Sequence, residues 1–71
     1  MQDAIREGDG VLLTAFGGEQ ITRRVVETRD DVVMVCTEEE YQAAHNEGRA
    51  PLAVGFRWRY VIAPYFPVVP A

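Results

Sequence analysis

Few residues of this chain have side chains suited to catalysis, and the sequence places them poorly for it. Cys36 and His45 are the one cysteine and the one histidine. A thiolate–imidazolium pair needs the two within hydrogen-bond reach. Cys36 lies in an apolar stretch, where a thiol usually packs inertly with a raised pKa, and His45 falls near the predicted end of a helix, where it complements the helix dipole. A catalytic pair is therefore not expected.

Metal and cofactor chemistry find equally little support. The run Glu38–Glu40 is acidic, but successive helical residues point about 100° apart and cannot converge on one ion. One cysteine and one histidine are too few for a structural zinc site or for an intramolecular disulfide. Lysine and serine are absent, which removes Schiff-base chemistry and the commonest hydroxyl nucleophile. The composition predicts a non-enzymatic protein with no metal and no cofactor.

The arginines indicate a second class of function. Arg23 and Arg24 lie in a predicted strand, and Arg57 and Arg59 flank Trp58. Small barrels stack bases on aromatic rings beside cations, so nucleic-acid or ligand binding is an alternative function. The contacts would be Arg23, Arg24, Arg57, Trp58 and Arg59. The net charge of −4 argues against a polyanionic partner.

The charges also allow two interpretations of the surface. Residues 30–47 are acidic and contain no arginine. If they lie opposite the arginine-bearing strands, separate basic and acidic sides would orient an assembly. Solvated faces with local ion pairs, such as Arg23 or Arg24 with a nearby carboxylate, are the other interpretation.

The most informative segment is residues 62–71, which carries no charge. Its prolines recur at every third position, the repeat of a polyproline II helix, and would therefore line one ridge. They are Pro64, Pro67 and Pro70. The other two ridges are filled by Tyr65, Phe66, Val68 and Val69, which leaves no polar face. Such a segment is expected to dock on its own core, on a sister subunit or in a partner's groove.

Aromatic residues concentrate before and within that segment, and a domain this small cannot bury all of them. Tryptophan, tyrosine and arginine are enriched at the centres of protein interfaces. We predict a self-assembly or protein-interaction module, with a homo-oligomer as the expected state. The predicted interface is Trp58, Tyr60, Pro64, Tyr65, Phe66, Pro67, Val68 and Val69. A third alternative is a small-ligand barrel, with a pocket of Trp58, Tyr60 and Tyr65 at a subunit interface.

The elements that position these residues follow from periodicity and turn residues. Strands are predicted at 10–16, 20–28 and 31–37, and Gly17-Gly18 favours a hairpin between the first two. Neither face of the second strand is purely apolar, so we expect it to twist or bend midway. Residues 31–37 are apolar on both faces, which is typical of a strand covered on both sides.

A helix is predicted next, over residues 38–47. Thr37 and Glu40 form the pattern of a capping box. Gly48 stands where helices commonly stop in the left-handed conformation. A last strand is expected over 52–62 with a bulge or bend at Gly55. The alternative is a strand ending at Arg57, a 3₁₀ turn over 58–60 and a new strand from Val61.

Together these elements predict a mainly β fold. A meander, one inserted helix and a closing strand resemble the SH3-like barrel architecture over residues 7–62. Residues 1–62 would form the domain and 63–71 a tail or linker. The first ten residues lack the apolar core of a secretory signal, and no apolar run is long enough to span a membrane. A cytoplasmic location is therefore expected.

Overall fold

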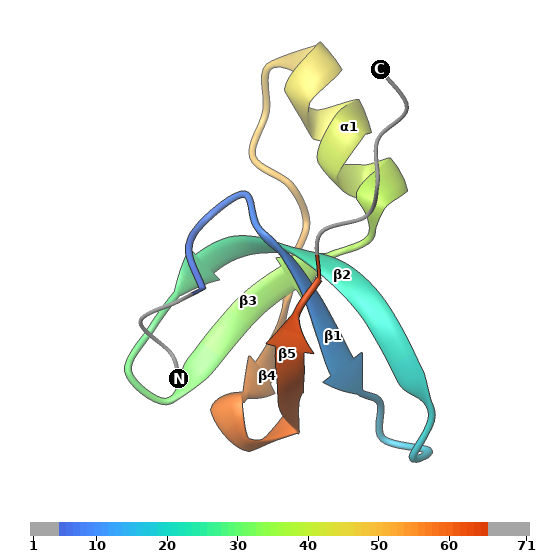
Figure 1. The fold of residues 1–71 in the computed structure, drawn as a ribbon. Helices are drawn as coiled ribbons and strands as arrows, with labels where there is room; N and C mark the ends of the chain where they lie inside the picture. The colour runs from blue at the N-terminus through green and yellow to red at the C-terminus, as the bar shows by residue number, and fades with distance from the viewer. Residues whose placement is uncertain (1–4, 66–71) are drawn as a thin grey trace.

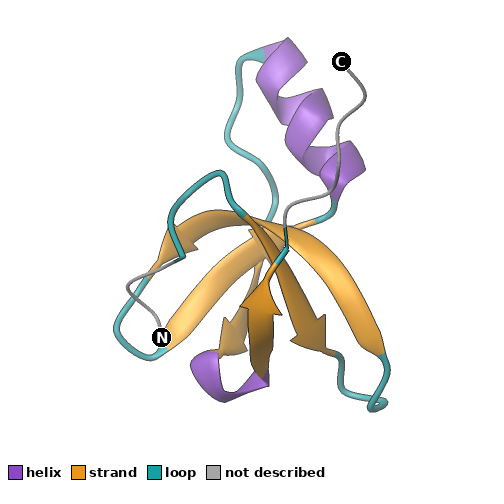
Figure 2. Ribbon diagram, viewed as in Figure 1, coloured by secondary structure: helices purple, strands orange, loops and turns teal. Residues whose placement is uncertain are grey.

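The computed structural model describes residues 5–65 as a curved antiparallel sheet with one helix at its end (Figures 1 and 2). The meander consists of β1 (Gly10–Thr14), β2 (Gln20–Thr28) and β3 (Val32–Cys36). β4 (Val54–Arg57) pairs with β3, and β5 (Val61–Pro64) pairs with β1, which gives the strand order β4-β3-β2-β1-β5. The predicted mainly β class is confirmed. β4 and β5 are the edges and are not paired with each other, so the described sheet is open.

Two register shifts help to curve the sheet. The pairing of β2 with β3 shifts between Val25 and Glu27, which confirms the bend predicted in the second strand. The pairing of β1 with β5 shifts where Leu12 faces Ala63 and Leu13 faces Val61, so Ile62 is an extra residue on the edge. Extra residues of this kind bend a strand and increase its twist.

The concave face of the sheet forms the core. Val11 and Leu13 of β1, Val25 of β2 and Val33 and Val35 of β3 are fully buried. Fully burying one such side chain contributes roughly 1.5–3 kcal/mol. Ile5 and Phe56 complete the buried cluster, which Ile21, Trp58, Tyr60 and Val61 flank. Along β1, Val11 and Leu13 are buried while Leu12 and Thr14 are half-buried.

Helix α1 (Glu38–Glu47) has the predicted bounds and the predicted caps. The Thr37 hydroxyl accepts a hydrogen bond from the backbone N–H of Glu40 at 3.1 Å, and Gly48 ends the helix at φ 70°. The reciprocal half of the capping box does not form among the described residues. The Glu40 carboxylate instead accepts from Arg49 Nη1 at 2.6 Å and from the Leu52 backbone N–H at 2.9 Å. Glu40 thus fastens the loop after α1 to the first turn of the helix.

The last part of the described chain follows the alternative prediction. β4 ends at Arg57, a 3₁₀ turn η2 covers Trp58–Tyr60, and β5 starts at Val61. β5 continues to Pro64, so residues 63 and 64 of the predicted tail lie in the sheet. In Figure 1, η2 and the β1–β2 hairpin lie at one end of the molecule, and α1 lies at the other. No helix in residues 5–65 has the length and apolar character needed to span a bilayer.

Candidate interaction surfaces

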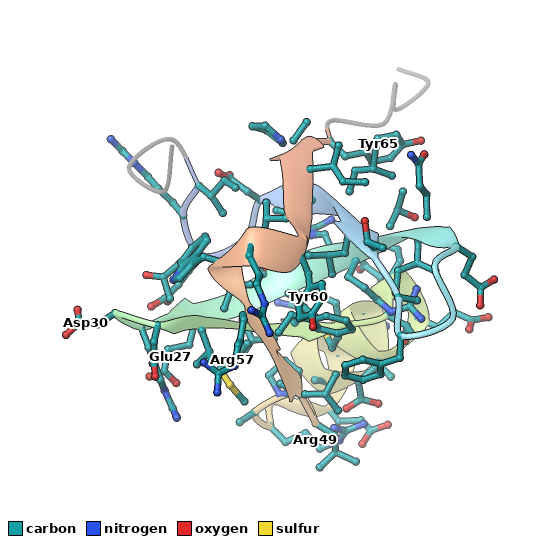
Figure 3. The ribbon with its side chains drawn as sticks, turned by 90° about the horizontal axis from the view of Figure 1, so that it is seen from below. Glu27, Asp30, Arg49, Arg57, Tyr60 and Tyr65 are labelled. Carbon is teal, nitrogen blue, oxygen red and sulfur yellow. The ribbon has the colours of Figure 1, made fainter. Side chains whose placement is uncertain are left out.

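The residues of the predicted interface lie at opposite ends of β5. Trp58 and Tyr60 lie in η2, before β5 begins. Pro64 ends β5, and the Tyr65 backbone N–H donates to the Gly10 carbonyl at 2.8 Å, at the start of β1. Figure 3 shows Tyr60 and Tyr65 well apart. Phe66, Pro67, Val68, Val69 and Pro70 lie outside the described residues.

Trp58 serves first as a structural contact. Its ring is partly buried against the core, and its indole Nε1 donates to the Arg29 carbonyl at 2.8 Å. Arg29 lies in the turn between β2 and β3, so this bond ties η2 to a segment that is distant in sequence. The indole N–H is therefore not free to bind a partner.

An exposed ring that is not among the predicted interface residues lies beside Tyr60. Phe16, in the β1–β2 hairpin, is 84% exposed, although its ring stacks on Phe56 with centroids 5.6 Å apart and planes 13° apart. Its ring also meets Tyr60 edge-on, with a centroid distance of 6.2 Å. One signal was present in the sequence, because an aromatic residue directly before Gly17-Gly18 lies in a turn. We call Phe16, Phe56 and Tyr60 the Phe16 surface.

The arginines do not form a continuous basic face. The Arg24 guanidinium binds the Glu38 carboxylate at 3.1 and 3.2 Å, and its Cζ lies 4.1 Å from the Tyr41 ring centroid. The second strand and the acidic helix therefore touch at Arg24, which fits the interpretation of local ion pairs. Arg23 Nη1 donates to the Thr22 carbonyl.

The other candidate nucleic-acid contacts lie at the opposite end of the molecule. Arg57 ends β4, and Arg59 lies in η2 with its Cζ 5.3 Å from the Tyr60 ring centroid. Arg23 and Arg24 are near the start of α1, whereas Arg57, Trp58 and Arg59 are in and beside η2 (Figure 1). The structure therefore brings the candidates together in two separate groups.

A pocket of about 240 Å³ lies at the helix end of the sheet. Its lining residues are Gly10, Thr22, Arg23, Arg24, Glu38 and Tyr65. Of the three aromatic residues predicted to line a ligand pocket it contains only Tyr65. Trp58 and Tyr60 lie in η2, outside the lining of this pocket, and a pocket at a subunit interface stays a prediction.

Cys36 and His45, the residues considered for a catalytic pair, differ in their exposure to solvent. Cys36 is buried, and this burial raises the pKa of its thiol, an effect that the Glu40 carboxylate increases. His45 is exposed on α1, and no hydrogen bond joins it to Cys36 within residues 5–65. The described part of the chain also holds no group of three or more histidine, cysteine or acidic side chains placed to bind a metal ion.

Comparison with protein-family models, curated proteins and solved structures found none that matches this chain.

Proposed function

We propose that this chain is a non-enzymatic self-assembly module in which the proline-rich segment of one copy binds the Phe16 surface of another. The observation that carries the proposal is the 84% exposure of Phe16, whose ring stacks on Phe56 and leaves its other face open. Aromatic-lined surfaces bind polyproline II segments with little loss of conformational entropy. The spacing of Pro64, Pro67 and Pro70 supports such a segment as the occupant.

The direction of β5 favours a second copy over the same chain. Val61 is opposite Leu13 and Pro64 is opposite Val11, so β5 runs away from the hairpin that carries Phe16. Phe16 lies six positions beyond Gly10, a span of about 20 Å in extended chain. In a polyproline II conformation, residues 66–71 would span about 19 Å beyond Tyr65. The segment would also have to reverse direction to reach the Phe16 surface of its own chain, which favours a second copy as its partner.

Complementary variants test this mechanism by solution mass. Phe16→Ser removes the surface, and Phe66→Asp with Val69→Asp places charge on one ridge of the segment. Each variant alone should have a lower mass than the wild type at the same concentration. An equimolar mixture should regain mass, because the first variant keeps an intact segment and the second keeps an intact surface.

A chain with all three substitutions is the matched control and should add no mass to either variant. A wild-type monomer at all accessible concentrations contradicts the proposal. So does a mixture whose mass equals the mean of its components.

The scaffold class belongs to the same proposal. The meander, the inserted helix and a 3₁₀ turn before the last strand support an SH3-like barrel, with β4 and β5 as its unpaired edges. Nucleic-acid binding is the weaker candidate because its contacts are divided between two ends of the molecule. Absence of single-strand binding at low salt is the expected result.

A further inference from the structure

The two edge strands of the sheet differ in how well they are protected against pairing with another strand. Both are four residues long. β5 carries Pro64 and the extra residue Ile62, and prolines and bulges are devices that prevent edge pairing. β4 has neither device, and Val54 on it is 59% exposed. The free edge of β4 is therefore the one more available for pairing with another strand.

We infer that β4 pairs antiparallel with β4 of a second copy, about a two-fold axis at Gly55. The inference rests on the proposed self-association only in its choice of partner, and it uses neither Phe16 nor the proline-rich segment. Around a two-fold axis perpendicular to the sheet, side chains keep the same face in both copies, and only the residue on the axis lies opposite its own symmetry mate. With Gly55 on the axis, Val54 comes opposite Phe56 of the second copy.

This register is favourable on both faces. Within one chain, Val54 pairs with Val35 and Phe56 pairs with Val33 on β3, so Val54 and Phe56 both point to the buried face. In the proposed dimer, Phe56 of the second copy covers the exposed part of Val54. An aliphatic–aromatic cross-strand pair of this kind is stabilising. On the other face Arg57 comes opposite Ala53 rather than a second arginine, which avoids a like-charge contact.

The strand itself limits which residue can occupy the axis. A side chain at Gly55 would have its Cβ 3.2 Å from Met34 Sδ, so within one chain a larger residue there would have to displace the Met34 side chain by a few tenths of an ångström. The same missing side chain allows close approach of two backbones at the axis. Leu52, which is 78% exposed, extends the apolar surface just before β4.

The test uses the full-length chain carrying Phe66→Asp and Val69→Asp, in which the proposed contact of the proline-rich segment is disabled. We expect this chain to be a dimer by light scattering. Adding Val54→Lys should give a monomer, whereas adding Ile62→Lys on the β5 edge should leave the dimer. Ile62 is a matched control because it is also an exposed aliphatic edge residue, at 46%.

Amide hydrogen exchange gives a second readout that requires no variant of β4. In the wild type, amides of β4 should exchange more slowly as protein concentration rises, while those of β5 should not change. If the chain with Phe66→Asp and Val69→Asp is a monomer, and hydrogen exchange of the β4 amides does not depend on protein concentration, this inference is overturned. The proposed function then still stands. If the segment substitutions leave the wild-type mass unchanged and Val54→Lys lowers it, the proposed function fails and this inference stands.

Discussion

Two aromatic residues of the η2 end show opposite uses of a ring. The polar side-chain atom of Trp58 donates to the Arg29 carbonyl, whereas the Phe16 ring contacts Phe56 and Tyr60 and is otherwise exposed to solvent. Tryptophan is common at interface centres, yet here its hydrogen bond assigns it to the interior. Exposure and hydrogen bonding therefore separate a structural aromatic residue from a candidate contact residue.

Replacing Trp58 measures this structural role. Trp58→Phe leaves the Arg29 carbonyl without its donor and removes part of a packed ring. The free energy of unfolding should therefore fall by about 1–2 kcal/mol. Tyr60→Phe is the matched control, because no hydrogen bond of its hydroxyl occurs within residues 5–65, and it should change stability by less than about 0.5 kcal/mol. Urea unfolding at one fixed protein concentration provides the comparison. Equal effects of the two substitutions would show that the indole bond contributes nothing.

At the level of elements, Glu40 connects the helix to the loop that leads into β4. The hydrogen bonds from Arg49 and then from the Leu52 N–H hold the pKa of the Glu40 carboxyl below its ordinary value. A carboxyl with a lowered pKa stabilises the fold when ionised, and this contribution is lost as pH falls through that pKa. Acid should therefore weaken the connection between α1 and β4.

The expected result is a stability difference between wild type and Glu40→Gln that depends on pH. The wild type should be the more stable protein near pH 7, and the difference should shrink as pH falls from about 5 to 3. Denaturant midpoints across this range measure it. Glu39→Gln is the neighbouring control and should show no comparable pH dependence, since no ion pair of Glu39 occurs among the described residues. A constant Glu40→Gln difference would contradict the assignment.

The same elements show what the sequence could predict. The bounds of α1 depend on local signals, Thr37 and Gly48, and both were identified correctly. The capping box was only half right, because the Glu40 carboxylate is bound by residues 9 and 12 positions downstream. A pattern within one turn of helix contains no information about such contacts.

The candidate surface was harder to predict for a related reason. Tyr60 and Tyr65 are close in sequence, so they were assigned to one surface, but an extended strand carries residues five positions apart about 16 Å from each other. Tyr60 and Phe16, far apart in sequence, meet because β1 pairs with β5 and η2 precedes β5. Only the strand pairing brings these two rings together.

For the molecule as a whole, size is the governing constraint. A chain of 71 residues with one cysteine has neither a large core nor a disulfide to stabilise it. Its described part exposes Phe16, Leu52 and Val54. Covering these side chains in an assembly would add apolar burial that the small core cannot supply. Stability and assembly should therefore be linked by mass action.

This linkage predicts a thermal midpoint that depends on protein concentration. For a dimer that unfolds to two separate chains, a tenfold rise in concentration should raise the midpoint by about 3–6 °C for a domain of this size. The chain with both Phe16→Ser and Val54→Lys should show a midpoint independent of concentration, because both proposed contacts are removed from exposed positions. Calorimetric scans over a hundredfold concentration range make the comparison. If the wild-type midpoint is constant over that range, the folded state is stabilised within one chain, and the exposed apolar residues must then serve a partner other than a second copy.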